Sequence, residues 1–228
     1  MKVLTFDIVA LIFAIGDWYS IVRKNEKLQY VFKPMVPIIL ILMLVVSPAA
    51  NGIPGERKYW IISALIFALL GDVFLMLPFD GFIFGLASFA ICHIIIITGT
   101  ILTNNAGHSQ VKFDFFAMFL AAYLIIGAAP LFGIVKGLAK SKLQKLIAPV
   151  FIYSFLLTFM AGMLLASQVN GHFLYLAGIG GGLFVVSDMI LALNKFARPI
   201  RNGDCFVHVT YHLAIGSIAT AFVWIPWN

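Results

Sequence analysis

Residues 60–77 read WIISALIFALLGDVFLML, an apolar run that contains a single charged side chain, Asp72. A helix needs roughly 17–25 mostly apolar residues to cross the hydrocarbon core of a bilayer. Seven other runs of this kind lie along the chain, at residues 4–22, 34–50, 82–103, 113–135, 146–169, 173–194 and 205–225. The sequence therefore predicts an all-α fold, a polytopic integral membrane bundle of about eight transmembrane helices.

The composition agrees with this fold class. Apolar residues make up 62% of the chain and charged residues 11%, and the mean hydropathy is +1.05. A soluble globular protein is about 45–50% apolar and about 25% charged. The connections between the runs are too short to hold a soluble domain, so residues 1–228 are expected to form a single transmembrane domain. The first run contains Asp7 and Asp17 and its basic residues follow it, which is not the pattern of a cleaved signal peptide.

Prolines and cysteines lead to two further expectations. Pro34 and Pro37 are expected in the first turn of the second helix, where proline is tolerated. Cys92 and Cys205 belong to different helices, so they are expected to pack within the bundle and not to form a disulfide framework.

The basic residues are distributed unequally between the two sides of the predicted bundle. Eleven of the fifteen Lys and Arg residues fall on one side, namely Arg23, Lys24, Lys27, Lys33, Lys136, Lys140, Lys142, Lys145, Lys195, Arg198 and Arg201. Because short basic loops stay in the cytoplasm, both termini are expected to be non-cytoplasmic, in the cell (inner) membrane. The pI near 9.4 reflects this asymmetry and indicates no nucleic-acid partner.

Six polar residues fall at nearly the same depth in five of the runs: Asp17, Lys33, Asp72, Asp188, Tyr211 and His212. A charged residue at the centre of a membrane helix costs roughly 2.5–3.5 kcal/mol, so such residues usually mark a functional site. A small residue precedes each aspartate, in Gly16-Asp17, Gly71-Asp72 and Ser187-Asp188, and is expected to admit a neighbouring backbone or a ligand. His93 lies deeper, near the midplane. The sequence therefore predicts a polar pocket near one face of the membrane.

Structural roles for these residues stay open. A single polar residue in a helical bundle often serves only as a hydrogen-bonded contact between helices, and this applies above all to Asp17. His208 and His212 stand four residues apart, a spacing of metal ligands, but a catalytic zinc needs three protein ligands. The candidates for the third, His93 and Asp72, lie at a different depth from His208. We therefore expect no metal and no other cofactor.

Several short motifs occur in a fixed order along the chain: Lys33-Pro34; Gly71-Asp72-Val73-Phe74-Leu75-Met76-Leu77; Phe82, Gly85, Phe89 and His93; Ser187-Asp188-Met189-Ile190-Leu191-Ala192-Leu193-Asn194-Lys195-Phe196; and Thr210-Tyr211. Together they resemble the YhhN family of membrane proteins, whose vertebrate members are lysoplasmalogenases. The sequence departs from the family after Leu213-Ala214, where Ile215 stands in place of a glutamine, and after His93, where isoleucines replace an aromatic residue.

The resemblance implies an ether hydrolase that cleaves the vinyl ether bond of lysoplasmalogens, giving a fatty aldehyde and a glycerophospho-amine. This reaction needs an acid that protonates an alkene carbon and a carboxylate that stabilises the resulting cation. Asp72 and Asp188 are the candidate catalytic pair, and the sequence leaves open which of them is the acid. The candidate substrate-binding residues are Lys33 as the phosphate contact, His93 and Tyr211 as supporting donors, and Asp17 and His212. The expected partners are a lysophospholipid substrate and the lipid bilayer, and the oligomeric state is left open.

A proton-coupled transporter of a small molecule or lipid is the alternative, because it too would place Asp, Lys and His inside a bundle. Such a transporter should have a polar path that continues to the opposite face. The runs 60–77, 173–194 and 205–225 are almost wholly apolar beyond the predicted site, which favours the enzyme. A purely structural scaffold would not need three acidic residues at one depth.

Overall fold

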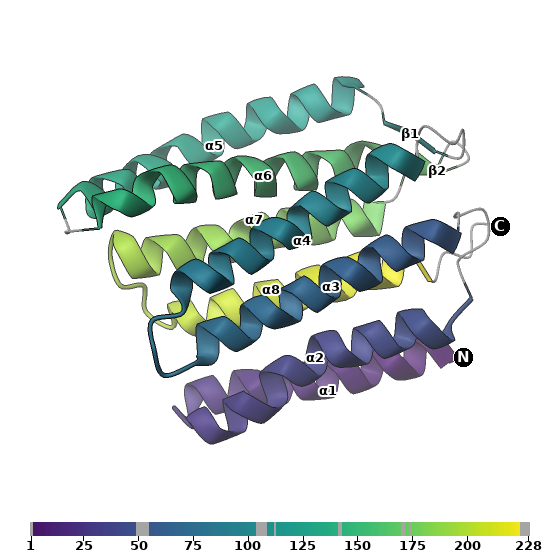
Figure 1. Ribbon diagram of the computed structural model, residues 1–228, viewed down its shortest axis with the longest axis horizontal. Coiled ribbons are helices and arrows are strands. Elements are labelled where there is room, and N and C mark those ends of the chain that lie inside the picture. Colours follow the sequence, from purple (N-terminus) through teal and green to yellow (C-terminus); the bar gives the residue numbers. More distant parts are fainter. Residues whose placement is uncertain are drawn as a thin grey trace.

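The computed structural model describes residues 2–48, 55–103, 109–111, 113–140, 143–169, 172–173 and 175–223. Within these ranges eight helices run alternately in opposite directions (Figure 1): α1 (Lys2–Val22), α2 (Glu26–Val46), α3 (Gly55–Met76), α4 (Phe82–Thr103), α5 (Phe113–Lys140), α6 (Ile147–Ala166), α7 (Tyr175–Phe196) and α8 (Gly203–Ala221). A short 3-10 turn, η2 (Gln144–Leu146), precedes α6. The all-α helical bundle expected from the sequence is confirmed.

A small antiparallel sheet lies at one end of the bundle. Its strands, in spatial order, are β1 (Ser109–Val111), β2 (Ser167–Val169) and β3 (His172–Phe173). Gln168 of β2 pairs with Gln110 of β1 and with Phe173 of β3. The sheet joins the α4–α5 and α6–α7 connections, which are far apart in the sequence.

The start of the second helix was predicted wrongly. α2 begins at Glu26, eight residues before the expected start, because the Asn25 side chain accepts a hydrogen bond from the Leu28 amide at 3.2 Å and caps the helix. The expected start at residue 34 was the start of an apolar run, and such a run does not include the polar first turn of the helix. Pro34 and Pro37 therefore lie inside the helix and not in its first turn, and each removes one backbone hydrogen bond.

The outer faces of the helices are apolar. On α1, Leu4, Ile8, Leu11, Ile15 and Tyr19 are exposed at helical spacing, whereas the opposite face is buried. By length and composition, α1, α2, α3, α4, α6 and α7 of the described chain can each cross a membrane. An apolar exterior around polar buried groups is the arrangement of an integral membrane protein.

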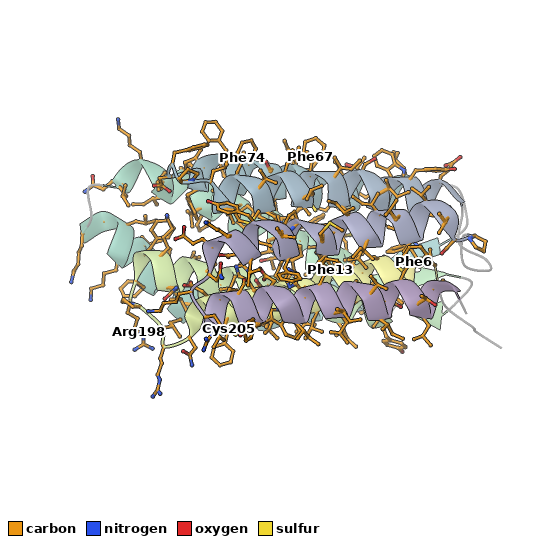
Figure 2. All side chains as sticks on the ribbon, turned by 90° about the horizontal axis from the view of Figure 1, so that it is seen from below. Phe6, Phe13, Phe67, Phe74, Arg198 and Cys205 are labelled. Carbon is orange, nitrogen blue, oxygen red and sulfur yellow. The ribbon has the colours of Figure 1, made fainter. Side chains whose placement is uncertain are left out.

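The α1–α2, α3–α4, α5–α6 and α7–α8 connections lie at one end of the bundle, on the left in Figure 1. We call it the basic end, because most Lys and Arg side chains gather there; Figure 2 shows Arg198 and Cys205 at this end. The start of α1 and the end of α8 share the opposite end. Which end faces the cytoplasm stays a prediction from the charge distribution. Cys92 is buried and Cys205 partly buried, and both are free.

α7 lies between α6 and α8, and its glycines allow both neighbours to approach closely. A Cβ atom at Gly180 would lie 2.7 Å from the Ala214 carbonyl oxygen of α8, and one at Gly181 would lie 2.9 Å from the Ala161 Cα of α6. α7 therefore packs closely against both neighbours at these positions. Gly182 differs, because a Cβ there would meet no atom within 4 Å.

Candidate active site

A cavity of about 530 Å³ extends into the bundle from the basic end, and we call it the polar cavity. Its inner part is lined by Lys33 of α2, Asp72 of α3, Asp188 of α7 and Tyr211 of α8. Four exposed charged residues line its outer part: Lys24, Glu26, Lys195 and Asp204. Two predicted catalytic and two predicted binding residues therefore share one cavity.

Asp72 is held between a cation and a hydroxyl donor. Its Oδ1 lies 3.4 Å from the Lys33 ammonium nitrogen, and its Oδ2 accepts a hydrogen bond from the Tyr211 hydroxyl at 2.6 Å. All three side chains are at most 5% exposed. The Lys33 ammonium group and the Tyr211 hydroxyl both stabilise the ionised carboxylate, whereas its burial disfavours the charge.

Asp188 has different partners. The Tyr153 hydroxyl of α6 donates to Asp188 Oδ2, and His93 Nε2 of α4 lies 3.1 Å from the same hydroxyl oxygen. When Tyr153 gives its one hydrogen to Asp188, a neutral His93 donates from Nε2 and has no proton on Nδ1. Within the described chain Asp188 has no salt bridge, and His93 Nδ1 has no hydrogen-bond partner.

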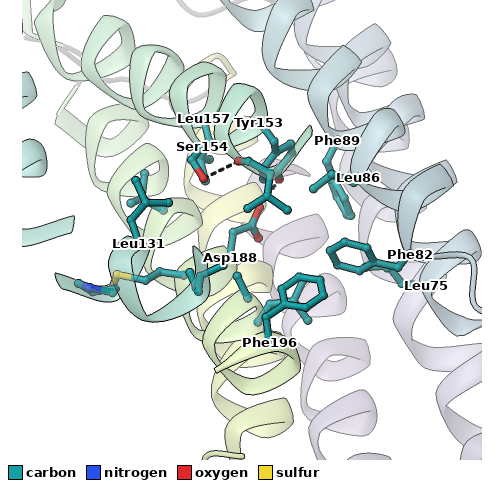
Figure 3. A pocket seen from close by; sticks show the side chains of 17 residues that line it. Leu75, Phe82, Leu86, Phe89, Leu131, Tyr153, Ser154, Leu157, Asp188 and Phe196 are labelled. Carbon is teal, nitrogen blue, oxygen red and sulfur yellow. Dashed lines mark hydrogen bonds between the residues drawn. The ribbon is translucent and has the colours of Figure 1, made fainter. Parts of the chain in front are cut away.

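An apolar pocket adjoins the polar cavity at Asp188. Figure 3 shows Asp188 and Tyr153 beside Leu86, Leu131 and Phe196, with α4, α5, α6 and α7 forming the walls. The pocket has a volume of about 50 Å³. Asp188 lines both spaces and thus lies where the surroundings change from polar to apolar.

Asp17 belongs to a separate cluster between α1 and α8. It is fully buried, and its Oδ2 lies 2.6 Å from His208 Nδ1 and 4.0 Å from His212 Nδ1. The Trp18 indole donates to His212 Nδ1 at 3.1 Å. His208 lines the polar cavity, but His212 lines a different one. The substrate-binding roles expected for Asp17 and His212 stay predictions, and the structure does not bring either residue to the wall of the polar cavity.

Tyr153 was not predicted from the sequence. This residue lies about two helical turns from the start of α6 at the basic end, as Tyr211 does from the start of α8. Its depth in the helix, the property that indicated Tyr211, could therefore have indicated Tyr153 too. Trp18 and His208 were not predicted as neighbours of Asp17, because the spacing of His208 and His212 indicated only a metal ligand.

In the structure the Nδ1 atoms of His208 and His212 lie 2.6 and 4.0 Å from the same oxygen, Asp17 Oδ2. Among the described residues, no group of three His, Cys, Asp or Glu side chains is arranged to hold a metal ion. The expectation that the protein uses no metal stays a prediction.

The fold and the site define an integral membrane protein whose described residues form eight helices around a polar cavity lined by Asp72 and Asp188. The model of the YhhN family matches residues 28–222, and the chain belongs to this family. It is also similar to lysoplasmalogenase TMEM86A from Homo sapiens, with 27% identity over 174 residues, 72% of this chain. The aligned part covers 65% of the human protein, somewhat less than two thirds of its length. No solved structure matches the chain.

Proposed function

We propose that this protein hydrolyses the vinyl ether bond of lysoplasmalogens to a fatty aldehyde and a glycerophospho-amine. Membership of the YhhN family and the similarity to a lysoplasmalogenase support this proposal. Its main structural support is the position of Asp188, at the junction of the polar cavity and the apolar pocket. A vinyl ether bond lies at the same kind of junction, between a polar headgroup and a hydrocarbon chain.

The charges at the mouth of the polar cavity suit a zwitterionic headgroup. Lys24 and Lys195 can attract a phosphate, and Glu26 and Asp204 can attract the amine of ethanolamine or choline. Lys33 can add a deeper phosphate contact, because an ammonium group has three donors and Asp72 occupies one of them. The first carbons of the hydrocarbon chain, next to the ether bond, then enter the apolar pocket beside Asp188.

The contacts of the two aspartates assign different roles to them in this proposal. Lys33 and Tyr211 keep Asp72 ionised, so Asp72 stabilises the cationic intermediate and activates water. Asp188 has only a neutral donor, Tyr153, and lies next to an apolar pocket, so it is the proton donor. His93 fixes the Tyr153 hydroxyl and acts through it as a positioning residue.

The reaction follows from these roles. Asp188 protonates the alkene carbon that bears the alkyl chain, which leaves an oxocarbenium ion and the Asp188 carboxylate. Water attacks the oxocarbenium carbon and loses a proton to Asp72. The hemiacetal then collapses to an aldehyde and a free glycerol hydroxyl, as its own O–H proton moves to the departing glycerol oxygen. The proton held by Asp72 passes to the Asp188 carboxylate and restores both side chains. The net reaction consumes one water and no proton.

The test is aldehyde release by the purified protein from a lysoplasmalogen in detergent micelles. The matched control substrate is the saturated alkyl ether with the same headgroup, which lacks the alkene carbon that Asp188 would protonate. We expect aldehyde from the vinyl ether and no product from the alkyl ether. Failure to release aldehyde, or cleavage of the saturated ether, would contradict the proposal.

A further inference from the structure

The run 205–225 was expected to be almost wholly apolar beyond the predicted site, but the structure places polar groups of α1 and α8 together beyond the polar cavity, toward the end of the bundle where α1 starts. A separate cavity of about 280 Å³, here called the α1–α8 cavity, lies in that half. Asp7, Ser217 and Thr220 line it, and the Thr220 hydroxyl donates to Asp7 at 2.9 Å. Most of its other lining residues are apolar, so the polar partners that a water molecule needs lie at Asp7, Ser217 and Thr220.

The cluster around Asp17 separates the two cavities. His208 lines the polar cavity, His212 lines the α1–α8 cavity, and Asp17 Oδ2 lies between their Nδ1 atoms, at 2.6 and 4.0 Å. A fully buried carboxylate in a membrane bundle is expensive, and chains of Asp and His in such positions mark proton paths. Helix packing alone would not require two histidines, and it would not require each of them to line a different cavity.

The hydrogen bonds show where such a path is interrupted. An indole N–H can only donate, so His212 Nδ1 accepts from Trp18 and the ring proton of neutral His212 is on Nε2. Within the described chain His212 Nε2 and Asp17 Oδ1 have no hydrogen-bond partner. Trp18 therefore occupies the nitrogen through which His212 could exchange a proton with Asp17.

We propose that Asp17, His208 and His212 form a proton relay between the polar cavity and the α1–α8 cavity, with Trp18 as its gate. His208 takes a proton at Nε2 from the polar cavity and passes its Nδ1 proton to Asp17. When the Trp18 indole moves away, Asp17 gives this proton to His212 Nδ1, and His212 releases its Nε2 proton to the α1–α8 cavity. Tautomer exchange in both rings restores the starting state, and the reverse sequence moves a proton in the other direction.

Proton flux into liposomes tests the relay without any lipid substrate. Purified protein is reconstituted with a pH-sensitive dye inside the vesicles, and a pH difference is imposed. We expect the wild-type protein to dissipate the pH difference faster than it decays in protein-free liposomes, and Trp18→Phe to dissipate it faster still. Asp17→Asn should dissipate the pH difference no faster than it decays in protein-free liposomes. Equal rates for the wild type and protein-free vesicles, or no increase in Trp18→Phe, would overturn the relay.

A matched pair of glycine variants tests the route while leaving the relay residues intact. Gly216 lines the α1–α8 cavity, and a Cβ there would meet no atom within 4 Å, so Gly216→Leu can fill the cavity without a clash at Cβ. Gly182 is equally open but lines none of these cavities. We expect Gly216→Leu to slow the flux and Gly182→Leu to leave it unchanged; unchanged flux in Gly216→Leu would refute the route. Aldehyde release by the same preparations tests the hydrolase proposal separately.

Discussion

The three aspartates follow small residues for different reasons. A Cβ at Gly16 would lie 2.7 Å from the Phe32 ring, and one at Gly71 would lie 2.6 Å from the Phe89 ring. Ser187 instead donates its hydroxyl to the Val207 carbonyl at 2.9 Å and fixes α7 against α8. The small residues thus admit aromatic rings at two positions and provide a hydrogen bond at the third.

Asp72→Asn and Asp188→Asn should each lower kcat for aldehyde release by about 10²–10⁴, the usual contribution of a positioned proton-transfer group. Asparagine keeps the size of the side chain but can neither donate a carboxylic proton nor carry the negative charge. The control is Asp114→Asn, which changes an exposed residue of α5 and should retain wild-type kcat. Near-normal turnover in both site variants, in well-folded protein, would rule out the two-carboxylate mechanism.

Tyr153→Phe should lower kcat by about tenfold or more with little change in KM. The variant leaves Asp188 without its donor and His93 Nε2 without its acceptor, and an unsatisfied buried group costs about 1–3 kcal/mol. Steady-state kinetics separates kcat from KM. The matched control is Tyr59→Phe, because the Tyr59 side chain is exposed. A rise in KM at unchanged kcat would instead place Tyr153 in substrate binding.

Chelators should not lower aldehyde release. His208 and His212 share Asp17, and no third ligand completes a metal group in the described part of the chain. The measurement is activity before and after EDTA treatment, together with the metal content of the purified protein. Stoichiometric zinc, with activity lost on its removal and regained on its addition, would reverse this assignment.

At the scale of a helix, α7 offers two adjacent glycines with opposite surroundings. Gly181→Ala should destabilise the protein by roughly 1–3 kcal/mol, because its Cβ would lie 2.9 Å from the α6 backbone. Gly182→Ala should be neutral or stabilise it by up to about 1 kcal/mol, because the new methyl group has space and alanine favours a helix. Thermal unfolding in detergent compares the two. Equal melting temperatures would show that α7 can move away from α6 at little cost.

At the scale of the whole molecule, the prediction concerns orientation. The even number of helices places the start of α1 and the end of α8 at the same end, opposite the basic end. The excess of Lys and Arg predicts that the basic end is cytoplasmic. Tags on either terminus should therefore be cleaved by protease added to sealed right-side-out membrane vesicles. Protection of both tags would reverse the orientation and place the mouth of the polar cavity on the outside.

Properties that run along the chain could be predicted from the sequence. Apolar runs long enough to cross a bilayer identified the eight helices, and counting residues along them placed Asp72, Asp188, Lys33 and Tyr211 at one depth. Both are one-dimensional quantities, because hydropathy depends on composition and depth on the rise per residue. The start of α2 was missed for a local reason, since the Asn25 cap adds a polar first turn that hydropathy does not detect.

The tertiary structure decided which of these residues meet. Asp17 lies at a similar depth to Asp72 and Asp188, yet it pairs with His208 while the other two line the polar cavity. Tyr153 bonds to Asp188 from a helix that starts 28 residues before α7. The depth of a residue in the membrane does not determine how its helix is rotated about its own axis or which helices lie next to it. Both depend on side chains packing between helices that are distant in the sequence, and so only the folded bundle determines them.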